Sequence, residues 1–391
     1  MSALRKLLPR QDGDGALGSA SRLNPRRQWA KWALLVASSA IAVLLAESLT
    51  RLLAPQNVYP DRHIFLSSSH FQVDSVGAVR YLPKERVRMV AISNSSIEYD
   101  VEYNTNNAGF IDHQDYQPIA YEPRAAGKKF AIVGDSFAAG VHGGDPWIPR
   151  LRDAVQAEDP SVMLYNLGVE GTGPAQFRRL LVSVANEIPF DNIVIMAISD
   201  DFRRPMWRPL ATNGNVYFCA VGVTDRVCAT RLPFARIINF NSTMPDLLRM
   251  SEEISRAHSL FRSPILHLEI SLKQSHFVVL LARAFKRLTG LQPPPDYRPL
   301  REIRQQFGNL PVHLVHLPQE NEVRAGHYDL DLQRVTASMG IRYFPALTRC
   351  EWSPNMFYRL DGHPNAEGYQ AISNCVSKYL GLRGMRRDRG H

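Results

Sequence analysis

The sequence predicts an α/β fold, a parallel sheet with helices on both faces, preceded by one N-terminal transmembrane helix. Three observations predict it. From residue 128 onward, short apolar runs alternate with segments of helical pattern. The first of these runs ends in a tight turn, Gly134-Asp135-Ser136, at the place where open α/β sheets bind ligands. Near the N-terminus, residues 29–53 form an apolar segment long enough to cross a bilayer.

Length and composition fit a folded protein with one large domain or two small ones. The 391 residues are 45% hydrophobic and carry a formal net charge of +9. The positive charge is not gathered into a basic stripe interleaved with aromatic residues, so the sequence does not favour nucleic-acid binding. We assign the excess of positive charge to the protein surface and to the flanks of the membrane segment.

The N-terminal region divides into a leader and an apolar segment. Residues 1–28 are polar and contain glycine and arginine, which predicts a disordered leader. Residues 29–53 provide roughly twenty apolar positions, about one bilayer, and Trp29 and Trp32 suit its interface. The positive-inside rule leaves the preceding basic residues in the cytoplasm. These residues are Arg22, Arg26, Arg27 and Lys31.

This arrangement predicts a single-pass anchor in the inner membrane, with the C-terminal domain in the periplasm or outside the cell. Two alternatives are open. A cleaved signal peptide is one, because Ala40-Ile41-Ala42 resembles a cleavage site, but apolar residues continue past it. The other is a buried helix of a soluble domain, which fits poorly with the basic leader.

Four cysteines follow the anchor, and an even number in an oxidising compartment predicts disulfides. Three pairings are open. Local closure favours Cys219–Cys228 and Cys350–Cys375, and four free buried thiols are the alternative. No close pair of cysteines or histidines has zinc-finger spacing, so we expect no metal.

Residues 55–127 form a lead-in to the main domain. They are rich in Pro, Asn, Ser and Tyr, with short alternating runs. Residues 86–92 have the pattern of a strand, and 104–112 that of a turn. We expect short strands and loops that pack on the domain that follows.

The main domain occupies residues 128–391, and strands separated by helices indicate a parallel sheet. His313 and His316 lie three apart on one predicted strand and therefore face opposite sides, where we expect ordinary sheet residues rather than ligands. The predicted strands are 130–133, 162–166, 192–198, 311–317 and 341–344, and the predicted helices are 146–157, 172–186 and 368–380.

Residues 203–300 interrupt the alternation and form an insert. It contains two helical stretches, roughly 244–261 and 264–288, and the apolar part of the second is too short to span a membrane. Three roles are open for this second stretch: a lid over the site, a helix against the bilayer, or plain packing on the domain, which we favour.

Residues able to carry chemistry follow the first three predicted strands of the main domain. Ser136 follows the first strand, and the glycine-rich stretch 166–173 follows the second, where glycines allow close backbone approach to a ligand. The stretch 199–202, Ser-Asp-Asp-Phe, follows the third. The stretch 361–365, Asp-Gly-His-Pro-Asn, precedes the closing helix.

In this order, the stretches resemble the SGNH/GDSL hydrolase superfamily, and more closely its membrane-anchored bacterial members. Two further features add to the resemblance: the stretch 106–112, Asn-Asn-Ala-Gly-Phe-Ile-Asp, and the pair Glu47 and Arg51 near the end of the anchor. The resemblance covers roughly residues 100–200 and 310–380, and it leaves the insert out.

The resemblance implies a flavodoxin-like, three-layer α/β fold and ester chemistry at a serine, without a cofactor. Ser136 matches the nucleophile, and His363 matches the general base that takes its proton. Asp361 matches the residue that orients this histidine and stabilises its cation. The backbone N–H groups of Ser136 and Gly171 match two oxyanion donors. Each residue could instead have a purely structural role. Ser136 and Gly171 would then be turn residues, His363 a residue at a helix N-terminus, and Asp361 a helix cap.

Two departures from the family pattern affect this site. The family's third oxyanion donor is an asparagine, and Asp200 stands in its place. An ionised carboxylate cannot donate a hydrogen bond, and the loss of one donor costs about 2.7–4 kcal/mol. Protonation of Asp200 by burial, or a donor from elsewhere, would compensate. The second departure is the spacing Asp361-x-His363, where many members have Asp-x-x-His, so the carboxylate that orients His363 is open.

The sequence therefore predicts an extracytoplasmic, serine-dependent acyl-ester hydrolase or O-acyl(acetyl)transferase. A fixed anchor and a basic surface suit a cell-envelope glycan or lipid as substrate, with envelope-assembly proteins as further partners and no nucleic acid. The acceptor, water or a sugar hydroxyl, is open, although the spacing Asp361-x-His363 favours O-acetyl transfer. The alternative is a catalytically impaired binding or scaffold protein of a polysaccharide assembly, which Asp200 favours.

Overall fold

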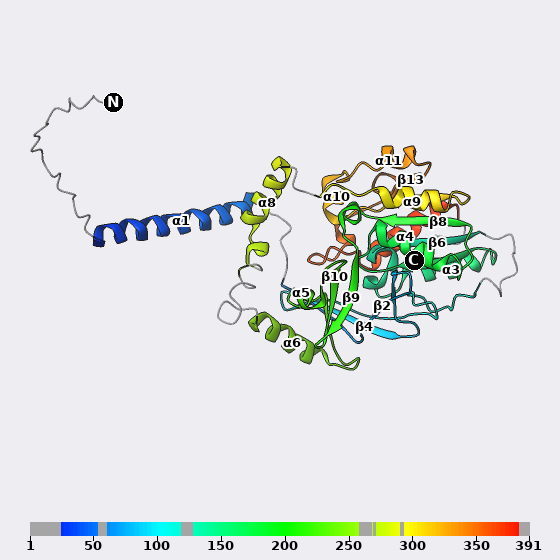
Figure 1. Cartoon of the computed structure of the whole chain (residues 1–391), viewed down its shortest axis with the longest axis horizontal. Helices are drawn as coiled ribbons and strands as arrows, with labels where there is room; N and C mark the ends of the chain where they lie inside the picture. The colour runs from blue at the N-terminus through cyan, green and yellow to red at the C-terminus, as the bar shows by residue number, and fades with distance from the viewer. Residues whose placement is uncertain are drawn as a thin grey trace, which may run out of the picture. The chain divides into compact units, whose positions relative to one another are not determined.

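The computed structural model of the chain contains two compact units (Figure 1). One holds the N-terminal helix and the beginning of helix α8 (His276–Thr289), and the other holds the β-sheets and the helices that cover them. Most of the leader predicted at 1–28 lies outside the described residues. The structure describes residues 25–53, 61–118, 128–257, 268, 271–289 and 293–382.

Helix α1 (Pro25–Leu53) contains the apolar segment. Its stretch Trp29–Leu53 has 25 residues and a mean hydropathy of 1.9, and little of it is buried in the protein. At about 1.5 Å per residue this stretch is longer than the roughly 30 Å hydrocarbon core of a bilayer. The helix is therefore long and apolar enough to be a membrane anchor or a signal sequence.

Five parallel strands form the central sheet, in the spatial order β13-β12-β8-β6-β7. Read from β7, this is the flavodoxin-like order 2-1-3-4-5, which confirms the predicted fold class. The strands are β6 (Lys129–Gly134), β7 (Met163–Gly168), β8 (Asn192–Ala197), β12 (Val312–His316) and β13 (Arg342–Pro345).

The alternation of side chains along the central strands produces three layers. Along β6, Val133 belongs to the core cluster on one face of the sheet, and Ile132 belongs to the cluster on the other face. Because helices cover both faces, the strands read as continuous apolar runs. The face of Ile132 is covered by α3 (Trp147–Gln156) and α13 (Ala366–Leu380), and that of Val133 by α4 (Pro174–Val184) and α9 (Arg298–Gln306).

A second, six-stranded sheet joins the lead-in to the insert. The sequence analysis predicted short strands in the lead-in, of which it located one at 86–92, and named no strand in the insert. Strands from both segments pair in the order β5-β4-β1-β11-β10-β9. Strand β1 runs parallel to β11, with Phe65 opposite Arg236. The strands are β1 (Arg62–Leu66), β4 (Arg86–Ser93), β5 (Ser96–Asn104), β9 (Trp207–Thr212), β10 (Asn215–Ala220) and β11 (Ala235–Ile237).

Shorter elements connect these layers. A small hairpin, β2 with β3, forms a separate two-stranded sheet. The short elements are β2 (Phe71–Val73), β3 (Val79–Tyr81), α2 (Ser136–Ala139), η2 (Val141–Gly143), η3 (Ser199–Arg203), α5 (Asp225–Cys228), α10 (Glu320–Ala325), α11 (Gln333–Ser338), α12 (Ala346–Arg349) and η4 (Pro354–Met356).

The helices of the insert differ from the prediction at one point. Helix α6 (Met244–Ala257) lies within the stretch predicted at 244–261, whose end is outside the described residues. The stretch predicted at 264–288 is interrupted at Ser275, and α8 begins after it. The hydroxyl of Ser275 accepts a hydrogen bond from the N–H of Val278 at 3.1 Å, as an N-cap serine does.

Two disulfides fasten the outer parts of the larger unit. Cys219 is bonded to Cys228, which ties β10 to α5, and Cys350 is bonded to Cys375 of α13. All four cysteines are thereby paired, in the arrangement that local closure predicts.

Candidate functional site

Ser136 lies at the carboxyl end of β6, as the first residue of α2. Asp135 caps this short helix, because its side chain accepts a hydrogen bond from the N–H of Phe137 at 2.9 Å. From the other side, the indole N–H of the buried Trp147 donates to the carbonyl oxygen of Phe137 at 3.0 Å. Local capping and a packed tryptophan thus hold the turn that carries the serine hydroxyl.

His363 reaches Ser136 from the loop that precedes α13. The Oγ of Ser136 lies 2.8 Å from Nε2 of His363, although the two residues are 227 positions apart in the sequence. The loop is fixed just after the histidine, where the side chain of Asn365 caps α13 by accepting from the N–H of Gly368 at 3.1 Å. The two residues predicted to act together are therefore within hydrogen-bond distance of each other.

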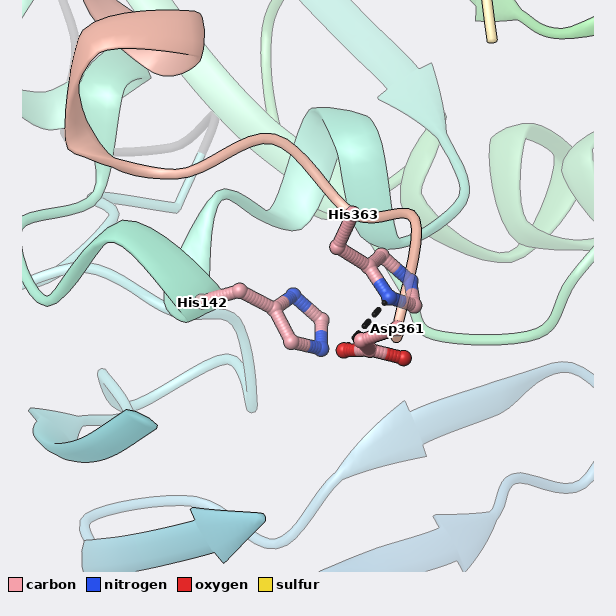
Figure 2. Close-up of side chains that lie close together, drawn as sticks. All are labelled: His142, Asp361 and His363. Carbon is pink, nitrogen blue, oxygen red and sulfur yellow. Dashed lines mark ion pairs between the residues drawn. The ribbon is translucent and has the colours of Figure 1, made fainter. Parts of the chain in front are cut away.

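Asp361 lies on the other side of the His363 ring (Figure 2). Its Oδ2 is 3.0 Å from Nδ1 of His363, but the two atoms are not aligned as a hydrogen bond. The guanidinium of Arg62, on β1, contacts Oδ1 of the same buried carboxylate. Asp361 therefore sits between an imidazole and an arginine, and nothing in the sequence motif pointed to Arg62.

The surroundings of His363 keep its ring neutral. Burial, and then the positive charge of Arg62, lower the pKa of His363 to about 4, from an ordinary value of 6.5. The carboxylates of Glu170 and Asp135 act in the opposite direction. A neutral imidazole is the form that can accept the proton of Ser136, and this form persists well into the acidic range.

A second histidine, His142, stacks on His363, and the sequence analysis missed it. The two rings lie 3.9 Å apart at an interplanar angle of 11°. His142 also lies 3.3 Å from Oε1 of the buried Glu170, and burial lowers its pKa to about 4. Figure 2 shows His142, His363 and Asp361 gathered in one place. The only sequence signal for His142 is its position a few residues after Ser136.

His142, His363 and Asp361 form a group that a metal ion could be expected to use, since one ligand atom from each lies within 4.8 Å of the others. The geometry argues against this use. The lone pairs of an imidazole lie in the plane of its ring, so two stacked rings do not direct them at one point. Arg62 also places a cation against Asp361.

Two backbone N–H groups are available next to Ser136. The N–H of Ser136 lies in the first turn of α2, where helix N–H groups have no partner within the helix. Gly171 has a φ of 66°, and its N–H donates to no acceptor in the described part of the chain. A Cβ on Gly171 would lie 2.8 Å from the ring of Phe218, so only glycine fits there.

The side chain of Asp200 is exposed and accepts a hydrogen bond from Nε2 of Gln319 at 2.9 Å. Its negative charge also acts on Arg204, whose guanidinium contacts Asp135. The buried neighbour Asp201 turns inward instead, and its Oδ2 accepts from the N–H of Ile198 at 3.0 Å. The role predicted for Asp200 stays a prediction.

Arg204, which the sequence analysis did not name, contacts the residue that precedes Ser136. Its Nη1 donates to Oδ2 of Asp135 at 2.8 Å and to the carbonyl oxygen of Thr172 at 3.1 Å, and it lies 2.6 Å from Oδ1 of Asp201. Asp135 precedes Ser136, and Thr172 follows Gly171. One guanidinium therefore ties together the two backbone segments that carry the candidate oxyanion donors.

Comparison with known proteins gives only distant matches. No protein-family model matches the chain, and no curated protein matches it either. Among solved structures, an acetylxylan esterase from Geobacillus stearothermophilus is similar, with 12% identity over 67% of this chain and 97% of that chain and a TM-score of 0.32. A lipase/acylhydrolase from Enterococcus faecalis has 12% identity over 66% and 99% of the two chains and a TM-score of 0.30. An α/β hydrolase enzyme from the metagenome of Lake Arreo, Spain, has 16% identity over 66% of this chain and 97% of that chain, with a TM-score of 0.34. At such identities and TM-scores, the case for a function rests on side-chain geometry.

A cavity of about 490 Å³ lies away from Ser136, bordered by β1, β10, β11 and α6. Of the residues that line it, only Arg62 also contacts the Ser136 site. His63, which lines the cavity, lies 2.7 Å from the hydroxyl of Ser251, but Ser251 is buried and is not among the lining residues. The size of the cavity therefore does not make it the reaction site.

Another serine–histidine pair is structural. Ser199 lies 3.0 Å from Nε2 of His316 and donates to Glu322. All three side chains are buried, and the ring of His316 stacks on Tyr328 at 3.8 Å. His313 is also buried and lies 2.9 Å from the hydroxyl of Tyr379. Neither histidine of this strand is accessible to a substrate, in agreement with their prediction as sheet residues.

Proposed function

We propose that this chain is a serine-dependent acyl-ester hydrolase or O-acyltransferase, held at a membrane by α1. The observation that carries the proposal is the chain of contacts from Ser136 Oγ to His363 Nε2, at 2.8 Å, and from His363 Nδ1 to Asp361 Oδ2, at 3.0 Å. A nucleophile, a base and a carboxylate in this order are what acyl transfer through serine requires. The flavodoxin-like sheet, with the serine at a strand's carboxyl end, supports the resemblance to SGNH/GDSL hydrolases.

The first half-reaction forms an acyl-enzyme. The Oγ of Ser136 attacks the carbonyl carbon of the ester while Nε2 of His363 takes the hydroxyl proton. The N–H groups of Ser136 and Gly171 donate to the oxyanion of the tetrahedral intermediate. The intermediate then expels the alcohol oxygen, which receives the proton from His363, and the acyl group stays on Ser136.

The second half-reaction removes the acyl group. His363 takes a proton from water or from an acceptor hydroxyl, and the resulting oxygen attacks the acyl-enzyme carbonyl. Collapse of the second tetrahedral intermediate returns the proton from His363 to Ser136 Oγ. The product is a free acid when water attacks and a new ester when a hydroxyl attacks.

Features outside the site support a proposal for the compartment and the substrate class. Two disulfides are typical of an oxidising compartment, and α1 is long and apolar enough to serve as an anchor. We therefore propose that the larger unit lies on the extracytoplasmic side of the inner membrane and acts on a cell-envelope glycan or lipid, with envelope-assembly proteins as partners. Fusion of a reporter to the N-terminus tests this topology, and a reporter exposed outside the cytoplasm would contradict it.

The reaction is tested with the full-length chain in detergent micelles and p-nitrophenyl acetate as substrate. Ser136→Ala is expected to lower kcat/KM by at least about 10³-fold, because it removes the nucleophile. Ser161→Ala is the matched control, since Ser161 is exposed and precedes β7, at the opposite end of this strand from the Gly171 loop. Equal rates in the wild-type chain and Ser136→Ala would contradict the proposal. Addition of an oligosaccharide then separates the two acceptors, because only a transferase yields an acetylated sugar.

A second candidate is a binding or scaffold protein with an impaired site. Two observations favour it: Arg62 shares the carboxylate of Asp361, and Asp200 supplies no third donor. In that case the wild-type chain and Ser136→Ala would both be inactive, while both would still bind the same envelope glycan.

A further inference from the structure

Helix α8 begins against the anchor helix α1. The carboxylate of Glu47, on α1, accepts hydrogen bonds from the hydroxyl of Ser275 at 2.7 Å and from the N–H groups of His276 and Phe277 at 3.1 and 2.9 Å. Arg51 donates to the same carboxylate at 2.7 Å. A carboxylate on one helix thus binds the first N–H groups of another, and this fixes the start of α8 beside α1 (Figure 1).

The position of Glu47 along α1 sets the level of this contact in a membrane. Glu47 is followed by Arg51 and then by Leu53, the last residue of α1, about 9 Å further along the axis. Charged residues of this kind lie at the interface between hydrocarbon and water. If α1 spans a bilayer, α8 therefore begins at the interface.

Helix α8 itself has the composition of a helix that lies on a membrane. Leu281 and Phe285 are 52% and 58% exposed, and they lie four residues apart, on one face of the helix with Phe277. The sequence of α8 also contains Arg283, Lys286 and Arg287 and no acidic residue. Exposed apolar residues, cationic residues and a length too short to span are characteristic of interfacial helices.

We propose that α8 lies in the plane of the membrane, with Leu281 and Phe285 among the lipid acyl chains and its basic residues near anionic headgroups. The inference rests on the proposed anchoring by α1. Only residues 290–297 separate α8 from α9 of the larger unit. A lipid-bound α8 would thus add a second, short tether and keep the Ser136 site near membrane-borne substrates.

The test uses the full-length chain in vesicles of phosphatidylcholine with phosphatidylglycerol. Single cysteines at Leu281, Phe285, Val43 and Ser161 are each given a nitroxide label, since the native cysteines are paired in disulfides. Power saturation with oxygen and with a nickel chelate then reports the depth of each label. We expect the labels at 281 and 285 at about 5–10 Å below the headgroups, the label at 43 deeper, and the label at 161 in water.

Any other depth of the labels would contradict the inference, and each such result identifies the step that fails. Labels at 281 and 285 in water, with the label at 43 in lipid, would overturn the inference and leave the anchor standing. Labels at 281 and 285 shielded from both relaxation agents would show that α8 packs on protein, which also overturns it. A label at 43 in water would refute the anchor, and the inference with it. Two label positions on one face guard against a local distortion by either label.

Discussion

At the scale of single residues, Arg62 determines the charge behind the candidate base. It contacts the carboxylate that would otherwise serve His363 alone, and its charge is the second cause, after burial, of the lowered pKa of His363. A base with a low pKa is weaker, but it stays in the neutral, proton-accepting form at acidic pH. Arg62 therefore makes His363 a weaker base but keeps its ring neutral over a wider range of pH.

Replacement of Arg62 tests this role. In Arg62→Gln the pKa of His363 is expected to rise toward its ordinary value, because a repelling cation is removed and Asp361 is left to the imidazole. Since activity requires neutral His363, the acid limb of the kcat/KM profile should move to higher pH. The profile is measured from pH 4 to 8 with p-nitrophenyl acetate, and Arg208→Gln, which affects an exposed ion pair on β9, is the control. An unmoved acid limb would contradict the assignment.

Asp200 and Arg204 provide a matched pair of substitutions. Arg204→Met is expected to lower kcat/KM by about 10²–10³-fold, the range for loss of an oxyanion-stabilising group, because it releases both backbone segments that carry the donors. Asp200→Asn should change kcat/KM by less than about threefold, since the exposed carboxylate faces Gln319. Arg204→Lys should recover part of the loss. Equal effects at the two positions would refute this distinction, and thermal unfolding of each variant shows whether the fold has been kept.

The residues that the sequence could reveal are those in local motifs. Ser136 stands in a strand–turn pattern and His363 in a short block before a helix, so each could be found by its neighbours in the sequence. Arg62, His142 and Arg204 belong to no such pattern. Their roles arise from contacts between segments far apart in the sequence, and apart from the closeness of His142 to Ser136 along the chain, a single sequence carries no signal for these contacts.

At the scale of elements, the insert takes part in building the site. The carbonyl oxygen of Gly171 accepts a hydrogen bond from the indole N–H of Trp207 at 2.8 Å, and Phe218 lies against the same glycine. Trp207 and Phe218 come from β9 and β10. The orientation of the Gly171 peptide group is thus set by strands that the family resemblance did not include.

Substitution of glycine measures this contact. Gly171→Ala is expected to lower kcat/KM at least tenfold, because its Cβ would meet the ring of Phe218 and displace the N–H donor. Gly214→Ala is the control for backbone strain alone: its φ is also positive, 70°, but its Cβ would meet nothing within 4 Å. Each should lose about 1 kcal/mol of stability from the positive φ. Comparable losses of kcat/KM in the two variants would show that backbone strain, and not the contact with Phe218, causes the loss.

Prediction of elements succeeded where the environment was uniform. The strands β6 and β8 are buried on both faces, so their sequences are unbroken apolar runs that are easy to recognise. Strands β9 and β11 are only partly buried, β11 has only three residues, and their sequences lack both an apolar run and a clear alternation. The interruption of the predicted helix at 264–288 depends on a serine cap and on Glu47, far away in the sequence.

At the scale of the whole molecule, buried neutral histidines make stability depend on pH. Burial lowers the pKa of His70 and that of His316 to about 3 each. In the unfolded chain their pKa is near 6.5, so between about pH 6.5 and 3 the unfolded state binds protons that the folded state does not. Stability is therefore fully present above pH 6.5 and is lost as the pH falls.

The size of this effect can be measured at His70. Each buried histidine is expected to reduce the free energy of unfolding by up to about 1.4 kcal/mol per pH unit below pH 6.5. His70→Asn should weaken this dependence, and asparagine tolerates the φ of 70° found at this position. Urea unfolding of the full-length chain in detergent, followed at pH 7.5 and 5, gives the slope. An identical slope in the variant would exclude His70 as a source.

The parallel pairing of β1 with β11 imposes an order on the maturation of the chain. Phe65 emerges from the ribosome early, but its neighbour Arg236 follows only after the Ser136 turn and the Gly171 loop have been made. Until then one edge of β1 has unpaired backbone groups and can recruit strands from other chains. Production of this protein should therefore benefit from slow synthesis and from chaperones that shield this edge, and truncation before residue 237 should yield aggregates rather than a smaller folded unit.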